Sequence, residues 1–179
     1  SLSAGNTGVL LVISRMILKM MDKVSKPALA GLWPNKKSLN VVLDLGANIE
    51  CDDKNLIDFA ELGSALHKSL FPNETPIVSL LNIGSEEIKG TETLKAAYKK
   101  LKELSGENNF IFNGYSEGNV IMSGNSNVIV TDGFTGNVAL KTAEGTAKFI
   151  TDNLKKTLTE NLFTKFSLFF SYFSLKKFK

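Results

Sequence analysis

The chain has 179 residues, of which 43% are hydrophobic and 22% charged, and its net charge is +3. This length and composition predict a soluble globular domain with a real core and exclude a disordered chain. The mild charge permits an acidic partner or an anionic membrane surface but does not indicate nucleic-acid binding. The single cysteine, Cys51, excludes an internal disulfide. The single histidine, His67, falls in a predicted helix, where we expect a surface position, and no His/Cys metal site is expected.

The chain opens on a loop of small residues that leads into an apolar segment, Val9–Met21. This segment is predicted to be a helix, and its apolar residues on most faces indicate burial. It is too short to span a bilayer, and the residues Ser1–Gly5 lack the basic region typical of a signal peptide. The loop's N–H groups and the side chains of Ser3, Asn6 and Thr7 are candidates to hold an oxyanion, with a plain helix N-cap as the alternative.

Strand and helix patterns alternate through the next hundred residues. After an extended segment at 26–30 and a surface turn at 33–37, the predicted strands are 40–45, 76–81, 109–112 and 128–130. The predicted helices are 56–70, 91–104 and one that starts near residue 138. Such alternation predicts an α/β fold with a largely parallel sheet.

Each predicted strand is followed by a loop in which glycine accompanies Asp, Asn, Glu or Lys. These loops are Asp44–Asn48, Asn82–Gly90, Asn113–Gly118 and Asp132–Asn137. Because the carboxyl ends of parallel strands meet at one edge of a sheet, we expect the four loops to form the functional site there.

The segment from Val130 to Asn137 reads VTDGFTGN and leads into a helix. Glycines at 133 and 136 allow a close approach of the backbone to a ligand, and the helix start offers N–H groups to an anion. The alternative is an ordinary strand-to-helix turn, with Asp132 as a turn residue and Thr135 as the helix N-cap.

Leucines, phenylalanines and lysines dominate residues 152–179. We predict two amphipathic helices joined near residues 163–168. Phenylalanines opposite lysines are typical of a helix that lies in a membrane interface. Packing on another part of the protein or on a second subunit is the open alternative. The predicted membrane-facing residues are Leu158, Leu162, Phe166, Phe169 and Phe173.

Four stretches, taken in order, resemble the PlsX-type phosphate acyltransferases of bacterial phospholipid synthesis. Their sequences are SAGNTG from Ser3, LDLGAN from Leu43, LLNIGSEEIKG from Leu80, and VTDGFTGNVALKTAEG from Val130. The order and spacing match over residues 1 to about 150. Each loop alone is a weak signal, but four in order are specific.

The resemblance implies an architecture similar to the isocitrate/isopropylmalate dehydrogenases, with a helical tail. It implies a homodimer that moves a fatty acyl group from acyl carrier protein to inorganic phosphate, without a cofactor or metal. It also implies a cytoplasmic protein attached peripherally to the inner face of the cell membrane. We expect residues 1–150 to form the α/β catalytic core, incomplete at its N-terminus, and residues 151–179 to form a membrane- or dimer-facing tail.

Site roles follow from the resemblance and from the chemistry of the loops. The expected catalytic residues are Lys89 as a cationic clamp, Asp132 as a group that orients a donor, and Asn137. The residues expected to bind phosphate or acyl phosphate are Ser3, Asn6, Thr7, Gly133, Thr135 and Gly136. Possible supporting residues are Asp44, Asn48, Asn82, Glu86, Glu87 and Glu117; the glutamates are expected to hold Lys89 rather than the anion.

Two other functions stay open on the sequence. One is a phosphotransacetylase-like enzyme that uses acyl coenzyme A, whose phosphate loops would look similar. The other is a non-catalytic remnant that binds a membrane or a partner through the Phe/Lys tail. A nicotinamide-dependent dehydrogenase is disfavoured because no Gly-x-Gly-x-x-Gly segment follows a predicted strand.

Overall fold

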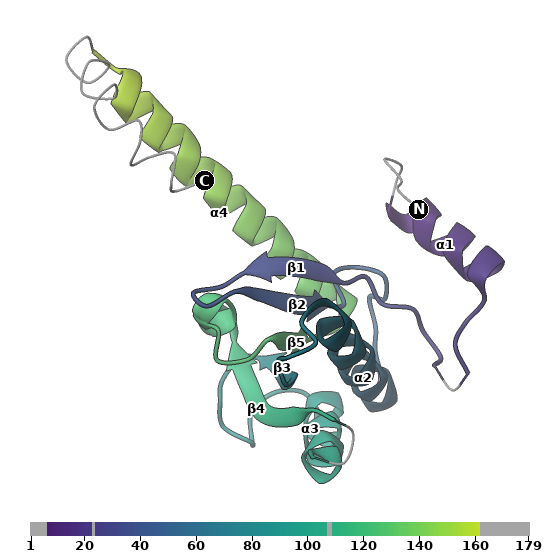
Figure 1. Ribbon diagram of the computed structural model, residues 1–179. Helices are drawn as coiled ribbons and strands as arrows, with labels where there is room; N and C mark the ends of the chain where they lie inside the picture. The colour runs from purple at the N-terminus through teal and green to yellow at the C-terminus, as the bar shows by residue number, and fades with distance from the viewer. Residues whose placement is uncertain (1–6, 23, 107–108, 162–179) are drawn as a thin grey trace. The chain divides into compact units, whose positions relative to one another are not determined.

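A computed structural model of the chain describes residues 7–22, 24–106 and 109–161 (Figure 1). The chain divides into two compact units, Ser1–Ala139 and Leu140–Lys179. One helix, α4 (Gly133–Thr159), contributes its first turns to the first unit and its remainder to the second. It therefore runs without a break through residue 150, where the sequence predicts the end of the core.

The first unit is built on a five-stranded sheet in the order β1-β2-β5-β3-β4. Its strands are β1 (Gly31–Pro34), β2 (Leu39–Leu43), β3 (Ile77–Asn82), β4 (Ile111–Glu117) and β5 (Val128–Val130). Strands β2, β5, β3 and β4 run parallel, and only the edge strand β1 is antiparallel to its neighbour. The predicted α/β fold with a largely parallel sheet is confirmed.

Two helices, α2 (Asp53–Leu70) and α3 (Glu92–Leu104), pack on the sheet and on each other. Helix α2 begins at a capping box in which Asp52 and Asn55 bond each other's backbone N–H groups, which satisfies donors that the helix itself leaves unpaired. A Cβ at Gly63 would lie 2.7 Å from a methyl carbon of Val128, so glycine lets α2 approach the central strand closely. Both predicted helices are confirmed, with α2 beginning three residues before the predicted start at 56 and α3 beginning one residue after the predicted start at 91.

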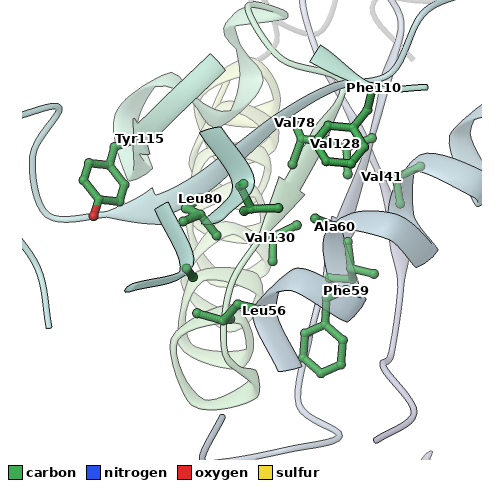
Figure 2. Packing of buried hydrophobic residues seen from close by; sticks show 13 residues of the cluster. Val41, Leu56, Phe59, Ala60, Val78, Leu80, Phe110, Tyr115, Val128 and Val130 are labelled. Atoms are coloured by element: carbon green, nitrogen blue, oxygen red, sulfur yellow. The ribbon is translucent and has the colours of Figure 1, made fainter. Parts of the chain in front are cut away.

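The core lies between this helical layer and the sheet. Figure 2 shows Leu56, Phe59 and Ala60 of α2 beside the valines and leucine of the strands. Phe59, Val78, Leu80, Val128 and Val130 are completely buried. The central strand β5 is buried along its whole length, which explains its uninterrupted apolar sequence.

Two predicted loops are strands in the structure. The segment predicted as a surface turn contains the end of β1, whose terminal Pro34 is tolerated because β1 is an edge strand. Strand β4 continues to Glu117 through the predicted loop. The register of β3 and β4 shifts between Val78 and Leu80, and Gly114 has a φ of 77°, so a β-bulge absorbs the extra residue.

Two burial predictions are wrong. Helix α1 (Thr7–Leu18) forms as expected, but Val9, Val12 and Met16 are 57%, 58% and 77% exposed among the residues that the structure describes. His67, expected on a helix surface, is completely buried near the end of α2, where its ring lies against Phe71. Burial lowers the pKa of His67, so its ring is neutral at neutral pH.

The second unit is described as far as residue 161. Over this part α4 exposes Phe149, Ile150 and Leu154, while Leu158 is half-buried. The remaining residues predicted to face a membrane, Leu162, Phe166, Phe169 and Phe173, lie outside the described residues, as does the predicted helix junction at 163–168. Among the helices that the structure describes, none has the length and apolar character needed to cross a membrane.

Candidate active site

The carboxyl ends of the four parallel strands lie at one edge of the sheet. Leu43 of β2 and Leu80 of β3 both pair with Val130 of β5, and Asn82 of β3 pairs with Glu117 of β4. Three of the four loops that the sequence identified, those after β2, β3 and β5, therefore start from the same edge, whereas the fourth, Asn113–Gly118, is mostly part of β4. In open α/β sheets this edge is where ligands bind.

A cavity of about 660 Å³ opens at this edge. Its walls come from the end of β3 and the residue after it (Leu81–Ile83), the loop before α2 (Ile49–Cys51) and the first turns of α4. Around the start of α3, the lining residues are Gly90, Thr91, Thr93 and Leu94. A volume of this size is typical of sites for small organic ligands.

The cavity wall is mainly apolar, and its charges have one sign. Leu56, Leu94 and Val138 line it from three different helices. Two acidic residues, Glu50 and Asp132, also line it, and no lysine, arginine or histidine does so among the described residues. The cavity itself is therefore suited to a neutral apolar group rather than to an anion.

Asp132 holds the first turn of α4. Its Oδ1 atom accepts a 2.8 Å hydrogen bond from the Thr135 backbone N–H, and its Oδ2 atom accepts one of 2.8 Å from the Thr135 hydroxyl. Asp132, not Thr135, thus serves as the helix N-cap. Both residues line the cavity, so the carboxylate fixes the orientation of a hydroxyl at its wall.

The two glycines of this turn allow backbone to pack on backbone. The Gly133 N–H donates to the Asn48 carbonyl at 2.7 Å, and a Cβ at Gly133 would lie 2.4 Å from that oxygen. A Cβ at Gly136 would lie 1.9 Å from the Asp44 carbonyl oxygen. The start of α4 therefore sits directly on the loop after β2, which no larger side chain would permit.

The carboxylate of Asp44 is completely buried inside that loop. Its Oδ1 atom accepts from the backbone N–H groups of Leu29, Gly46 and Ala47, and its Oδ2 atom accepts from the backbone and side-chain N–H groups of Asn48. Asn48 also donates to the Pro27 carbonyl. For Asp44 and Asn48 the sequence left open whether they serve the site or shape the turn. In the structure, the hydrogen bonds of both residues hold the turn.

Asn137 and Asn82 each fix a segment of backbone. Asn137 Nδ2 donates to the Leu45 carbonyl at 3.2 Å. Asn82 Nδ2 donates to the Lys89 carbonyl at 3.2 Å, and the buried Asn82 Oδ1 has no hydrogen-bond partner among the described residues. Asn82 also lines the cavity, although its Oδ1 atom is itself buried.

Lys89 lies next to the cavity on the loop after β3. Its Nζ atom is 3.0 Å from Glu86 Oε1, and both side chains are about half exposed. A hydrogen bond from Lys89 lowers the pKa of Glu86. Glu87 instead accepts from the hydroxyl of Tyr98, which raises the pKa of Tyr98 to about 12, and from Lys102. Of the two glutamates, Glu86 is the one that holds Lys89.

Four expected site residues contribute no described side-chain contact to the site. Ser3 and Asn6 lie outside the described residues, as does the side chain of Thr7. Glu117 is half-buried at the end of β4. No group of metal-ligating side chains occurs in the described part of the chain.

Cys51 is a cavity residue that the sequence did not single out as part of the site. Burial raises the pKa of its thiol, against the opposing effects of the Gly133 N–H and Lys26, so the thiol is neutral at neutral pH. Its position three residues after Asn48, in a loop that leads from the β2 end to α2, is the signal that places it at the same edge.

Comparison with known proteins places the chain in one family. The model of a family described as "Fatty acid synthesis protein" matches residues 1–179. A phosphate acyltransferase of Pelagibacter ubique is 61% identical over 178 residues, which cover 99% of this chain and 53% of that protein. A phosphate acyltransferase of Caulobacter vibrioides is 45% identical over 175 residues, which cover 98% of this chain and 48% of that protein.

The fold is also shared with a solved structure. The EutD phosphotransacetylase of Staphylococcus aureus superposes with a TM-score of 0.62 at 19% identity, over 83% of this chain and 49% of that one. This chain spans about half the length of the curated relatives that it matches. Because the family model matches the whole chain, the chain belongs to the fatty acid synthesis protein family, whose matched relatives are named phosphate acyltransferases.

Proposed function

We propose that this chain acts in the transfer of a fatty acyl group from acyl carrier protein to inorganic phosphate, which yields acyl phosphate for phospholipid synthesis. In that reaction a phosphate oxygen attacks the thioester carbonyl, the C–S bond breaks, and the carrier thiol leaves with a proton. The observation that carries the proposal is the apolar cavity at the carboxyl edge of the sheet, bordered by a lysine and a capped helix start, in a relative of phosphate acyltransferases.

Lys89 is the proposed phosphate clamp. It is half exposed, and its partner Glu86 lies on the surface, so an incoming phosphate can replace a carboxylate at the ammonium without exposing a buried charge. The proposed partners for phosphate are Thr135, Asn137 and the loop residues Ser3, Asn6 and Thr7.

The glycines contribute indirectly. The N–H groups of Gly133 and Gly136 already have acceptors in Asn48 and Asp132. We propose that these two glycines position the helix start, and that Asp132, which accepts the hydrogen bond of the Thr135 hydroxyl, holds the Thr135 side chain in place beside the substrate.

The test is phosphate-dependent release of free thiol from palmitoyl-acyl carrier protein. It compares the 179-residue chain, a chimaera carrying the flanking segments of the Pelagibacter ubique relative, and Lys89→Ala in the more active of the two. We expect Lys89→Ala to lower kcat/KM about a hundredfold, the scale of losing one group that stabilises developing charge.

Lys102→Ala is the matched control, because Lys102 also pairs with an exposed glutamate at 3.0 Å but lies near the end of α3 rather than on the loop that borders the cavity. It should change the rate less than twofold. No phosphate-dependent thiol release from either protein would refute the proposed reaction. Faster turnover of palmitoyl coenzyme A than of the carrier-protein thioester would favour the phosphotransacetylase-like alternative instead.

We further propose that the protein is a cytoplasmic homodimer attached peripherally to the membrane. Support comes from the second unit, where α4 exposes Phe149 and Ile150 on a helix that also carries Lys148 and Lys155. Light scattering checks the dimer. Sedimentation with anionic lipid vesicles checks attachment: Phe149→Asp should weaken it, while Val120→Asp, at an exposed valine of the first unit, should not.

A further inference from the structure

We propose that the cavity at the carboxyl edge of the sheet is the binding site for the hydrocarbon chain of the acyl donor, and that phosphate binds outside it. This inference rests on the proposed function and assigns the substrate's two chemically different parts to two different places. In the first unit, the apolar and acidic wall of the cavity favours the hydrocarbon chain, and the lysine beside the cavity favours the phosphate.

The wall chemistry excludes the anion from the cavity. Two of the residues that line the cavity, Glu50 and Asp132, carry a negative charge. No cationic side chain among the described residues lines the cavity to balance them. A phosphate there would be both desolvated and repelled, whereas an alkyl chain carries no charge to oppose.

The apolar wall is continuous across three elements. Leu81 and Ile83 come from the end of β3, Leu94 from α3, and Val138 and Ala139 from α4. Ile83 is 81% exposed and Val138 51% exposed, so both present apolar surface that an occupant would cover. Burying each methylene of a chain against such a surface raises affinity about fourfold.

The cation lies beside the cavity but not in it. Gly90 lines the cavity, and the Asn82 side chain on the wall holds the Lys89 carbonyl. The Lys89 side chain instead extends to Glu86 and packs by Gly84. An acyl chain in the cavity therefore places its carbonyl end toward the rim, where the half-exposed Lys89 ammonium can meet phosphate.

Binding of two neutral dyes tests the inference without any chemistry. Laurdan carries a dodecanoyl chain and prodan a propionyl chain on the same fluorophore. We expect the 179-residue chain to bind laurdan more than tenfold tighter than prodan, because at least two more methylenes are buried. Val138→Phe and Thr93→Phe fill the cavity from opposite helices and should each weaken laurdan binding at least tenfold.

Val120→Phe is the control, since Val120 is 38% exposed on the 3-10 helix η1 (Gly118–Ser123) and does not line the cavity. Circular dichroism melting confirms that each variant folds, and the two cavity variants lie in different helices so that one unfolded variant leaves the other to decide. Equal binding of the two dyes, or laurdan binding unchanged in the folded cavity variants, overturns the inference. So does laurdan binding that disappears in the chimaera, because another part of the protein then fills the cavity.

The enzymatic readout separates this inference from the proposed function. In an active protein, Val138→Phe should raise KM for the palmitoyl donor while leaving a butyryl donor nearly unchanged. Equal effects on both donors contradict a chain-binding role. The protein could also bind laurdan more tightly than prodan and yet turn over no donor. That result would support the cavity as a site for alkyl chains and contradict the proposed transfer reaction.

Discussion

Two aspartates follow two neighbouring parallel strands, and their sequence contexts look alike. Asp44 follows β2 and Asp132 follows β5, each with a glycine within two residues. In the structure, Asp44 is completely buried and satisfies donors of four different residues, whereas Asp132 caps a helix at the cavity wall. The same local signal thus encodes a structural carboxylate in one loop and a carboxylate within reach of a ligand in the other.

Asp44→Ala should give the largest effect on stability. It leaves the backbone N–H groups of Leu29, Gly46, Ala47 and Asn48 without their acceptor in a buried loop. Hydrogen bonds to a charged group contribute about 1.5–3 kcal/mol each when lost without replacement, so we expect the free energy of unfolding to fall by at least about 3 kcal/mol. Urea unfolding followed by circular dichroism measures this loss.

Asp44→Asn is the matched control, because it keeps the shape and removes one acceptor oxygen. It should retain part of the stability that Asp44→Ala loses. A loss below about 1 kcal/mol for Asp44→Ala would show that water replaces the carboxylate, and would remove the contrast with Asp132.

Gly136→Ala tests the contact that joins the two loops. Its Cβ would lie 1.9 Å from the Asp44 carbonyl oxygen, so the start of α4 must move away from the loop after β2. Overpacking of this kind costs about 1–3 kcal/mol. Thermal unfolding measures the cost, and an unchanged melting temperature would show that the helix start is not held against Asp44.

Asp132→Ala should have a smaller effect on stability than either change above. It removes the N-cap of α4, which costs about 1 kcal/mol. Because it also releases the Thr135 hydroxyl at the cavity wall, we expect a loss of activity larger than this stability loss explains. The check is kcat/KM in the thiol-release assay, measured well below the melting temperature. Asp132→Asn keeps one acceptor and should recover most of the cap but less of the rate.

Gly145→Ala is the smallest change and has the opposite sign. Gly145 lies in the middle of α4, and a Cβ there meets no atom within 4 Å. Alanine in an exposed helix interior should therefore raise the free energy of unfolding by about 0.5–1 kcal/mol. Comparison with Gly136→Ala by the same urea titration separates a glycine needed for packing from one that is not; destabilisation at residue 145 would contradict this distinction.

Much of the fold could be predicted because it depends on local pattern. The nearly continuous apolar run of β3, the uninterrupted run of β5 and the periodicity of α2 and α3 identify these elements without knowledge of their neighbours. Strand β1 and the end of β4 could not be predicted in this way. Each contains residues typical of turns, and only pairing with β2 and the bulge against β3 make them strands.

The site also divides into features that follow from local sequence and features that depend on tertiary packing. The sequence by itself determined a parallel α/β sheet and placed the polar loops at one edge, because side-chain periodicity and strand direction are local properties of the chain. Only the tertiary structure decided which aspartate is buried, which glycine bears a backbone contact, and that Cys51, Leu94 and Val138 share a cavity wall. These outcomes depend on distances between residues far apart in the chain, and packing sets those distances only when the sheet and its helices assemble.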